Sequence, residues 1–106
     1  MAWFYLLLAG LFEIGFASTL KLTQGFTKPL PTLVFLACAV TSFVLLARAA
    51  RELPIGTAYA VWTGIGAAGT VIVGILLYQE PASGLRLFFL ATLVGSLIGL
   101  KLATPT

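Results

Sequence analysis

The sequence predicts an all-α integral membrane protein with four transmembrane helices per chain. The chain has 106 residues, of which 60% are hydrophobic and only 8% are charged. A soluble domain carries about 25% charged residues, so this chain cannot cover its surface with groups that water solvates. Its apolar residues fall into four runs, each close to the roughly 20 residues that one crossing of a bilayer needs. The length permits one domain.

Each apolar run predicts one helix, and the four are expected at about 3–20, 31–50, 55–78 and 85–102. Glu13 alone interrupts the first run. That run has neither a basic segment before it nor a small-residue cleavage site after it, so it is interpreted as a retained membrane helix and not a signal peptide. Pro31 is tolerated in the first turn of the second helix, and aromatic residues near the ends suit interfacial anchoring: Trp3, Tyr5 and Tyr78.

Short connectors containing Gly, Pro and charged residues separate the runs, so consecutive helices are expected to be antiparallel neighbours with both termini on one side. The positive charges then divide evenly between the two sides, as Arg48, Arg51 and Lys101 against Lys21, Lys28 and Arg86. This balance gives no orientation by the positive-inside rule. Either a weaker signal decides the insertion, or copies insert both ways and pair antiparallel. The scattered basic residues predict no nucleic-acid partner.

Glu13 is the acid that the sequence places inside a predicted span. A charged carboxylate at the centre of a membrane helix costs about 2.5–3.5 kcal/mol on insertion scales, so Glu13 is a candidate functional residue. It can hold a proton or a cation, but holding both is disfavoured, and this competition is the minimum requirement for proton-coupled exchange. The alternative is a protonated side chain bonded to a neighbouring helix. Gly10, one turn earlier, leaves room for a cavity or, equally, for close helix packing.

The third run carries the stretch "TAYAVWTGIGAAG", in which a polar and aromatic stripe follows helical spacing: Tyr59, Trp62, Thr63 and Gly66. Aromatic faces suit a cation, and the Tyr O–H and Trp N–H can orient a carboxylate or a ligand. An interfacial aromatic belt is the competing interpretation. Ser42, in the second run, can bond Glu13 across helices or bond back to its own helix.

Glycine patterns give two further signals. Gly64, Gly66 and Gly69 spell G-x-G-x-x-G, but without a preceding strand the pattern does not predict a dinucleotide site. Gly95 and Gly99 form a GxxxG pair that favours helix association. The chain has no His and no Asp, and its one cysteine lies in an apolar run. We therefore predict no enzymatic activity, no metal site and no cofactor.

Several motifs together resemble the small multidrug resistance family over essentially the whole chain: "GFTK" at 25–28, "LPIGTAYAVWTGIGA" at 53–67 and "EP" at 80–81, with the acid of the first span. Within the family, Gly10, "WTGIGA" at 62–67 and "GLK" at 99–101 are similar to the guanidinium exporter subtype. The resemblance implies an antiparallel dual-topology homodimer in the bacterial inner membrane. It also implies a proton-coupled antiporter that exports guanidinium-type cations by alternating access.

The family's functional residues carry over to matching positions. The resemblance implies that protons and substrate compete for Glu13, one from each chain, with Ser42, Tyr59 and Trp62 beside it. The cavity lining would include Gly10, Phe16, Thr63 and Gly66, and the fourth helix would dimerise through Gly95 and Gly99. Phe16 departs from the subtype, which tends to have Trp three residues after the Glu. The loss of an indole N–H leaves an apolar surface that could admit bulkier guanidinium-like cations.

Three alternatives stay open beside this hypothesis. The first is a broader exporter of quaternary ammonium or lipophilic cations. The second is one half of a heterodimer, although paired partners usually carry opposite charge biases. The third is a non-transporting subunit, such as a rotary-ring proteolipid. That subunit would need two spans with the acid on the second, and here four spans are expected with the acid on the first.

Overall fold

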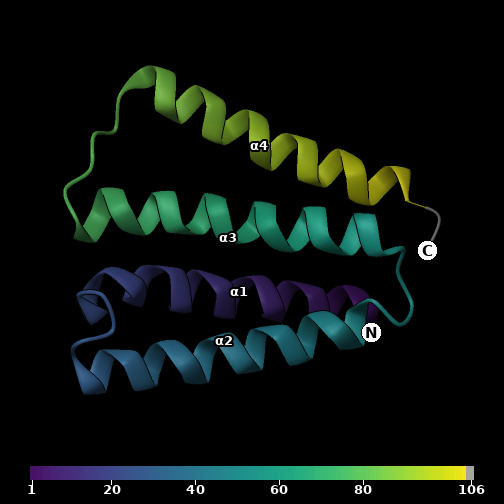
Figure 1. The fold of residues 1–106 in the computed structure, drawn as a ribbon. Coiled ribbons are helices and arrows are strands. Elements are labelled where there is room, and N and C mark those ends of the chain that lie inside the picture. The colour runs from purple at the N-terminus through teal and green to yellow at the C-terminus, as the bar shows by residue number, and fades with distance from the viewer. Residues whose placement is uncertain (105–106) are drawn as a thin grey trace.

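The computed structural model describes residues 1–104 and folds them into four α-helices and one short 3-10 helix (Figure 1). These are α1 (Ala2–Leu20), η1 (Lys21–Thr23), α2 (Pro29–Ala49), α3 (Ile55–Leu77) and α4 (Gly84–Ala103). All four α-helices are long and apolar enough to cross a membrane, which confirms the four predicted spans. The largest difference from the expected bounds is at α2, which begins at Pro29 and not at Pro31.

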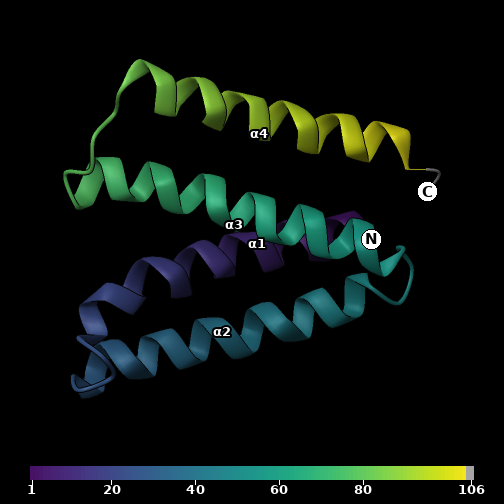
Figure 2. The ribbon, with the colours of Figure 1, turned by 45° about the horizontal axis from the view of Figure 1, so that its top comes forward.

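The helices form a flat layer in which α1 lies between α2 and α3, and α4 lies along the outer side of α3 (Figure 1). The layer measures 43 × 35 × 16 Å. Successive helices run antiparallel, so α1 and α3 are parallel, and α1 begins at the same end of the layer at which α4 finishes (Figure 2). This arrangement brings α1 and α3 side by side, although 34 residues separate the end of α1 at Leu20 from the start of α3 at Ile55.

Local sequence explains where the helices start and turn. Pro29 lies in the first turn of α2, where its missing N–H would have no helical partner. The side chain of Ser83 caps α4 by accepting a hydrogen bond from the backbone N–H of Arg86. Between η1 and α2 the chain reverses through a left-handed segment at Gln24, Gly25 and Phe26.

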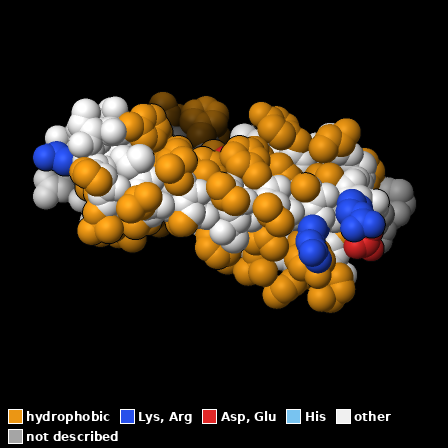
Figure 3. Space-filling view, turned by 60° about the horizontal axis from the view of Figure 1, so that its bottom comes forward, with side chains coloured by type: hydrophobic (Ala, Val, Ile, Leu, Met, Phe, Trp, Pro, Cys, Tyr) orange, Lys and Arg blue, Asp and Glu red, His pale blue; other side chains and the backbone are white. Residues whose placement is uncertain are grey.

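Few side chains are buried, and most of them lie where α1, α2 and α3 meet near the termini. This cluster consists of Ala2, Leu6, Ala9, Ala49, Leu53, Ala58, Val61 and Trp62. Elsewhere large apolar side chains cover the helices and face outward, as the hydrophobic middle of the molecule shows (Figure 3). Helix α4 has no buried residue at all. In a membrane this exposure carries no penalty, because lipid tails are as apolar as the side chains.

Charged side chains gather at the two ends of the layer (Figure 3). Three of them lie over aromatic rings: Lys21 over Tyr78, Arg48 over Tyr5 and Lys101 over Trp3, with 5.1, 5.9 and 5.1 Å from the cation to the ring centroid. Arg48 and Lys101 join α2 and α4 to α1, and Lys21 joins η1 to the residue that follows α3. Such amphipathic pairs suit the boundary between lipid and water, in agreement with the anchoring predicted for these aromatic residues.

Candidate functional site

A single hydroxyl group, that of Ser42, ties α1, α2 and α3 together. Its Oγ donates a hydrogen bond of 2.6 Å to the carbonyl oxygen of Ala9 in α1 and accepts one of 2.9 Å from the indole Nε1–H of Trp62 in α3. Ser42 is fully buried and Trp62 is 7% exposed. Because the carbonyl of residue i accepts from the N–H of residue i+4, Ala9 is also the helical partner of Glu13. The hydroxyl therefore fixes the turn of α1 that ends at Glu13.

The hydroxyl of Ser42 takes neither of the two partners expected for it. It bonds neither the Glu13 carboxylate nor its own helix, and it bridges Ala9 and Trp62 instead. A hydroxyl has one proton to donate, and here the Ala9 carbonyl receives it. The expected donor role of Trp62 is also changed, since its single N–H is already used by Ser42.

Glu13 lies on the α1 surface that faces α3, directly against Gly66. A Cβ atom at Gly66 would overlap both Cδ and Oε1 of Glu13, so any larger residue at this position would have to displace the Glu13 side chain. The Oε1 atom of Glu13 is buried and has no hydrogen-bond partner among residues 1–104. Within that part of the chain, the ion pair found is Arg86–Glu80, at the far end of α3, with 3.6 Å between Nη2 and Oε1. Glu13 therefore has no ion-pair partner among residues 1–104.

The space for the Glu13 carboxyl group is provided by Gly66 and not by Gly10. Gly10 does not face the carboxyl group, because a Cβ there would lie 2.6 Å from Cγ2 of Ile65. Gly10 therefore allows α1 and α3 to pack closely, which is the packing role left open from the sequence. Gly66, expected as a cavity residue from its position on the α3 stripe, is the glycine that makes space for the carboxylate.

The α3 stripe is divided between the interior and the surface. Trp62 and Gly66 are buried, whereas Thr63 is exposed and Tyr59 is 57% exposed. The ring of Tyr59 lies 5.9 Å from that of Trp62, centroid to centroid, at the open edge of the site. Neither Tyr59 nor Thr63 contacts Glu13 by a hydrogen bond within residues 1–104. The structure therefore brings Glu13 against Gly66 and Ser42 against Trp62, and it leaves Tyr59 and Thr63 at the exposed rim.

A row of aromatic rings continues from this rim across α2 to α1. Phe43 lies between Trp62, at 5.4 Å, and Phe16, at 6.1 Å, and Phe16 also meets Phe35 edge-on at 5.6 Å. Phe16 is partly buried in this row, so its ring packs against α2. Phe43 is not among the residues that the sequence predicts for the site. Its position directly after Ser42 could have indicated it, because this places Phe43 at the same membrane depth as the polar bridge, the hydrogen bonds that join Ala9, Ser42 and Trp62.

Helix α4 contributes nothing to this site. Gly95 and Gly99 lie on its surface, and a Cβ at either position would meet no atom within 4 Å. The GxxxG pair is therefore not used for packing within residues 1–104. It stays available to another helix.

The fold and the site together define a multi-pass membrane protein of four helices with one carboxyl group inside the helix layer. The family model for Small Multidrug Resistance protein matches residues 1–93. The chain is 52% identical over 104 residues to the guanidinium exporter of Citrobacter freundii, which covers 98% of this chain and 99% of the relative. It is 49% identical to the guanidinium exporter of Escherichia coli K12 over 104 residues, which again cover 98% of this chain and 99% of the relative. The chain belongs to the small multidrug resistance family, whose bacterial members lie in the inner membrane.

Proposed function

We propose that this protein exports guanidinium or small substituted guanidinium-type cations in exchange for protons that bind the same carboxyl group, Glu13. One observation carries the proposal: Oε1 of Glu13 is buried without a hydrogen-bond partner among residues 1–104. A buried acceptor left unpaired costs about 1–3 kcal/mol, and more if charged. A proton or the N–H group of a cation can each remove this cost. The guanidinium exporters to which the chain is similar support the same substrate class.

The exchange follows from the chemistry of one acid. An ionised Glu13 attracts a cation, whereas a protonated Glu13 has no charge with which to hold it. Protons and substrate therefore displace one another, and binding of either from one side of the membrane favours release of the other. Alternating access then requires only that the site opens to one side at a time. The polar bridge at Ser42 holds Glu13 at a fixed depth while this happens.

A second copy of the chain completes the site in this proposal. One chain supplies one acid within its spans, and an antiparallel homodimer would bring two Glu13 side chains to a shared cavity. The charge distribution supports insertion in both orientations, because each end of the layer carries three Lys or Arg residues and one Glu, either Glu52 or Glu80. The unfilled surface at Gly95 and Gly99 offers a contact for the second copy.

The nature of the unsatisfied group favours guanidinium over quaternary ammonium. Guanidinium is planar and presents N–H donors in a fork that matches a carboxylate. A quaternary ammonium ion has no N–H, so it would leave Oε1 unpaired. Export of quaternary ammonium or other lipophilic cations is the second candidate, and the aromatic row favours it. The faces of Tyr59, Trp62 and Phe43 can attract a cation that has no hydrogen to donate.

The test is transport in proteoliposomes with an acidic interior, where protons leaving down their gradient drive guanidinium in. We expect the native chain to accumulate guanidinium and Glu13→Gln to lose this gradient-driven uptake. Glu52→Gln is the matched control, because Glu52 is an exposed carboxylate in the turn between α2 and α3. Coupled uptake that survives in Glu13→Gln would reject the mechanism.

A substrate series separates the two candidates. The uptake rates of guanidinium, methylguanidinium and tetramethylammonium into proteoliposomes with the native protein are compared at the same pH gradient. The guanidinium proposal expects tetramethylammonium to be transported far more slowly than either guanidinium compound. Equal rates for all three cations would favour the broader exporter.

A further inference from the structure

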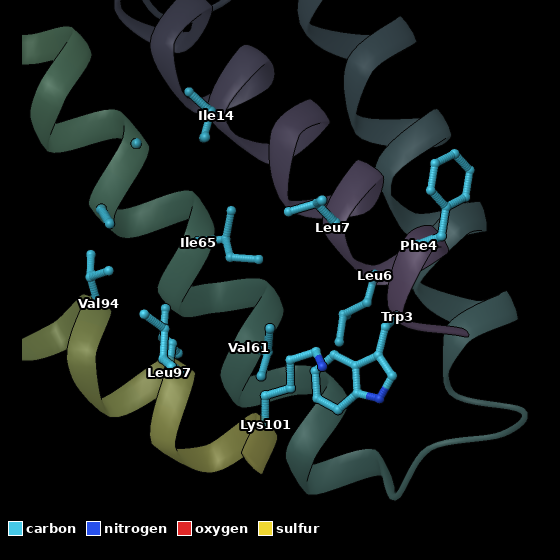
Figure 4. Close-up of a pocket in the computed structure, with 13 residues that line it drawn as sticks. Trp3, Phe4, Leu6, Leu7, Ile14, Val61, Ile65, Val94, Leu97 and Lys101 are labelled. Carbon is cyan, nitrogen blue, oxygen red and sulfur yellow. The ribbon is translucent and has the colours of Figure 1, made fainter. Parts of the chain in front are cut away.

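An apolar groove of about 620 Å³ runs between α1, α3 and α4, apart from the candidate site (Figure 4). It is lined by Trp3, Leu7, Ile14, Ile65, Leu97 and Lys101, among other side chains, and not by Glu13, Ser42, Tyr59 or Trp62. The groove is open on one side, since Phe4 and Ile98, which also line it, are 53% and 57% exposed. In a four-span membrane protein, lipid is the medium that meets this opening.

The length of the groove matches one leaflet of a bilayer. Trp3 lies at one end and Ile14 towards the other, eleven residues further along α1 (Figure 4). At 1.5 Å of rise per residue this is about 16 Å. Half of the roughly 30 Å hydrocarbon core is about 15 Å. An acyl chain that enters at the Trp3 end would therefore stay in apolar surroundings down to the bilayer midplane.

The groove has one charged lining residue, Lys101, and it lies at the end that faces the membrane surface. Its ammonium group is 5.1 Å from the centroid of the Trp3 ring, so the cation and the aromatic ring flank the mouth of the groove together (Figure 4). Arg48 and Arg51 lie at the same end of the layer. A cation beside an apolar groove complements a molecule that joins a negative head to a hydrocarbon tail.

We propose that this groove binds one acyl chain of an anionic phospholipid, with the lipid phosphate beside Lys101. The site is independent of the transport proposal, because it shares no residue with the candidate cation site. Binding there would fill the space between α4 and α1, which Lys101 and Trp3 bridge at one end only. The lipid would thereby fix the position of α4 relative to the three helices that hold the polar bridge.

Native mass spectrometry of the full chain, purified in detergent, tests the headgroup part of the proposal. The protein is mixed with equal amounts of phosphatidylglycerol and phosphatidylcholine that carry the same acyl chains, and the two adduct populations are compared. We expect phosphatidylglycerol adducts to dominate and Lys101→Gln to lower their excess by about fivefold, as expected for the loss of one cation near the headgroup. Arg48→Gln, which removes a cation that lies over Tyr5 at the same end, should leave the excess unchanged.

A second pair of variants tests the groove. Val94→Phe fills part of it and should lower the adducts of both lipids, whereas Val40→Phe, on the exposed surface of α2, should not. Ile98→Phe, also in the groove, repeats the test if Val94→Phe does not give a single species on gel filtration. Equal effects of Lys101→Gln and Arg48→Gln would overturn the headgroup assignment. Unchanged lipid adducts with an altered monomer–dimer ratio in Val94→Phe would assign the groove to a second copy and overturn the proposal.

Discussion

Gly66 of α3 lies directly against the carboxyl group of Glu13 in α1, so closely that a methyl group on the glycine would overlap both Cδ and Oε1. The carboxyl group meets a glycine backbone on one side, and its buried oxygen has no donor from residues 1–104.

Gly66→Ala should displace the Glu13 carboxyl group and lower guanidinium transport by about tenfold or more, because small misplacements of a functional group have large effects. The measurement is initial uptake in proteoliposomes. Gly56→Ala, in the first turn of α3, is the control, since a Cβ at that position meets no atom within 4 Å. Native rates in Gly66→Ala would mean that the carboxyl group works equally well in another position.

Ser42→Ala should destabilise the protein by about 1–3 kcal/mol, because the buried N–H of Trp62 would lose its acceptor. The free energy of unfolding is measured in mixed micelles with increasing dodecyl sulfate. In a Trp62→Phe background the same change should cost less, since no indole N–H is left unpaired. If the two substitutions prove additive, the hydrogen bond between Ser42 and Trp62 contributes no coupling energy.

Guanidinium binding should weaken as the pH falls, because a proton and the cation compete for Glu13. The sign follows from mass action: lowering the pH raises the protonated fraction, which has no charge to hold the cation. The apparent dissociation constant should rise by up to about tenfold per pH unit in the acidic range and level off in the alkaline range. Tryptophan fluorescence titrations at several pH values measure it. A dissociation constant that does not change with pH would exclude the competition.

Gly99→Leu should weaken the association of two chains without disturbing the fold of one chain. Gly99 lies on α4, which has no buried residue, and a Cβ there meets nothing within 4 Å. Chemical crosslinking in liposomes at low protein density measures the dimer fraction. Gly84→Leu, at the other end of the same helix and equally open, is the control. Equal dimer fractions in the two variants would place the dimer contact elsewhere.

The number and course of the helices could be predicted from the sequence because lipid imposes a simple rule. A span needs about 20 apolar residues, and the four runs separated by Gly, Pro and charged residues meet that rule independently of one another. The same rule singles out Glu13, since a charge inside a span is costly whatever its neighbours are. These predictions depend on composition along the chain and not on which residues meet across it.

Only the tertiary structure decided which residues meet Glu13. Gly10 and Gly66 are chemically identical, and each lies one helical turn from a candidate site residue, Glu13 for Gly10 and Trp62 for Gly66. The rotation and depth of α1 against α3 place Ile65 over Gly10 and the carboxyl group over Gly66. The sequence likewise left the hydrogen-bond partners of the Ser42 hydroxyl undetermined. The packing of α1 and α3 against α2 brings the Ala9 carbonyl and the Trp62 indole N–H within hydrogen-bond distance of it. The physical reason is that helix periodicity fixes which side chains share a face, whereas packing between helices fixes the partner that each face receives.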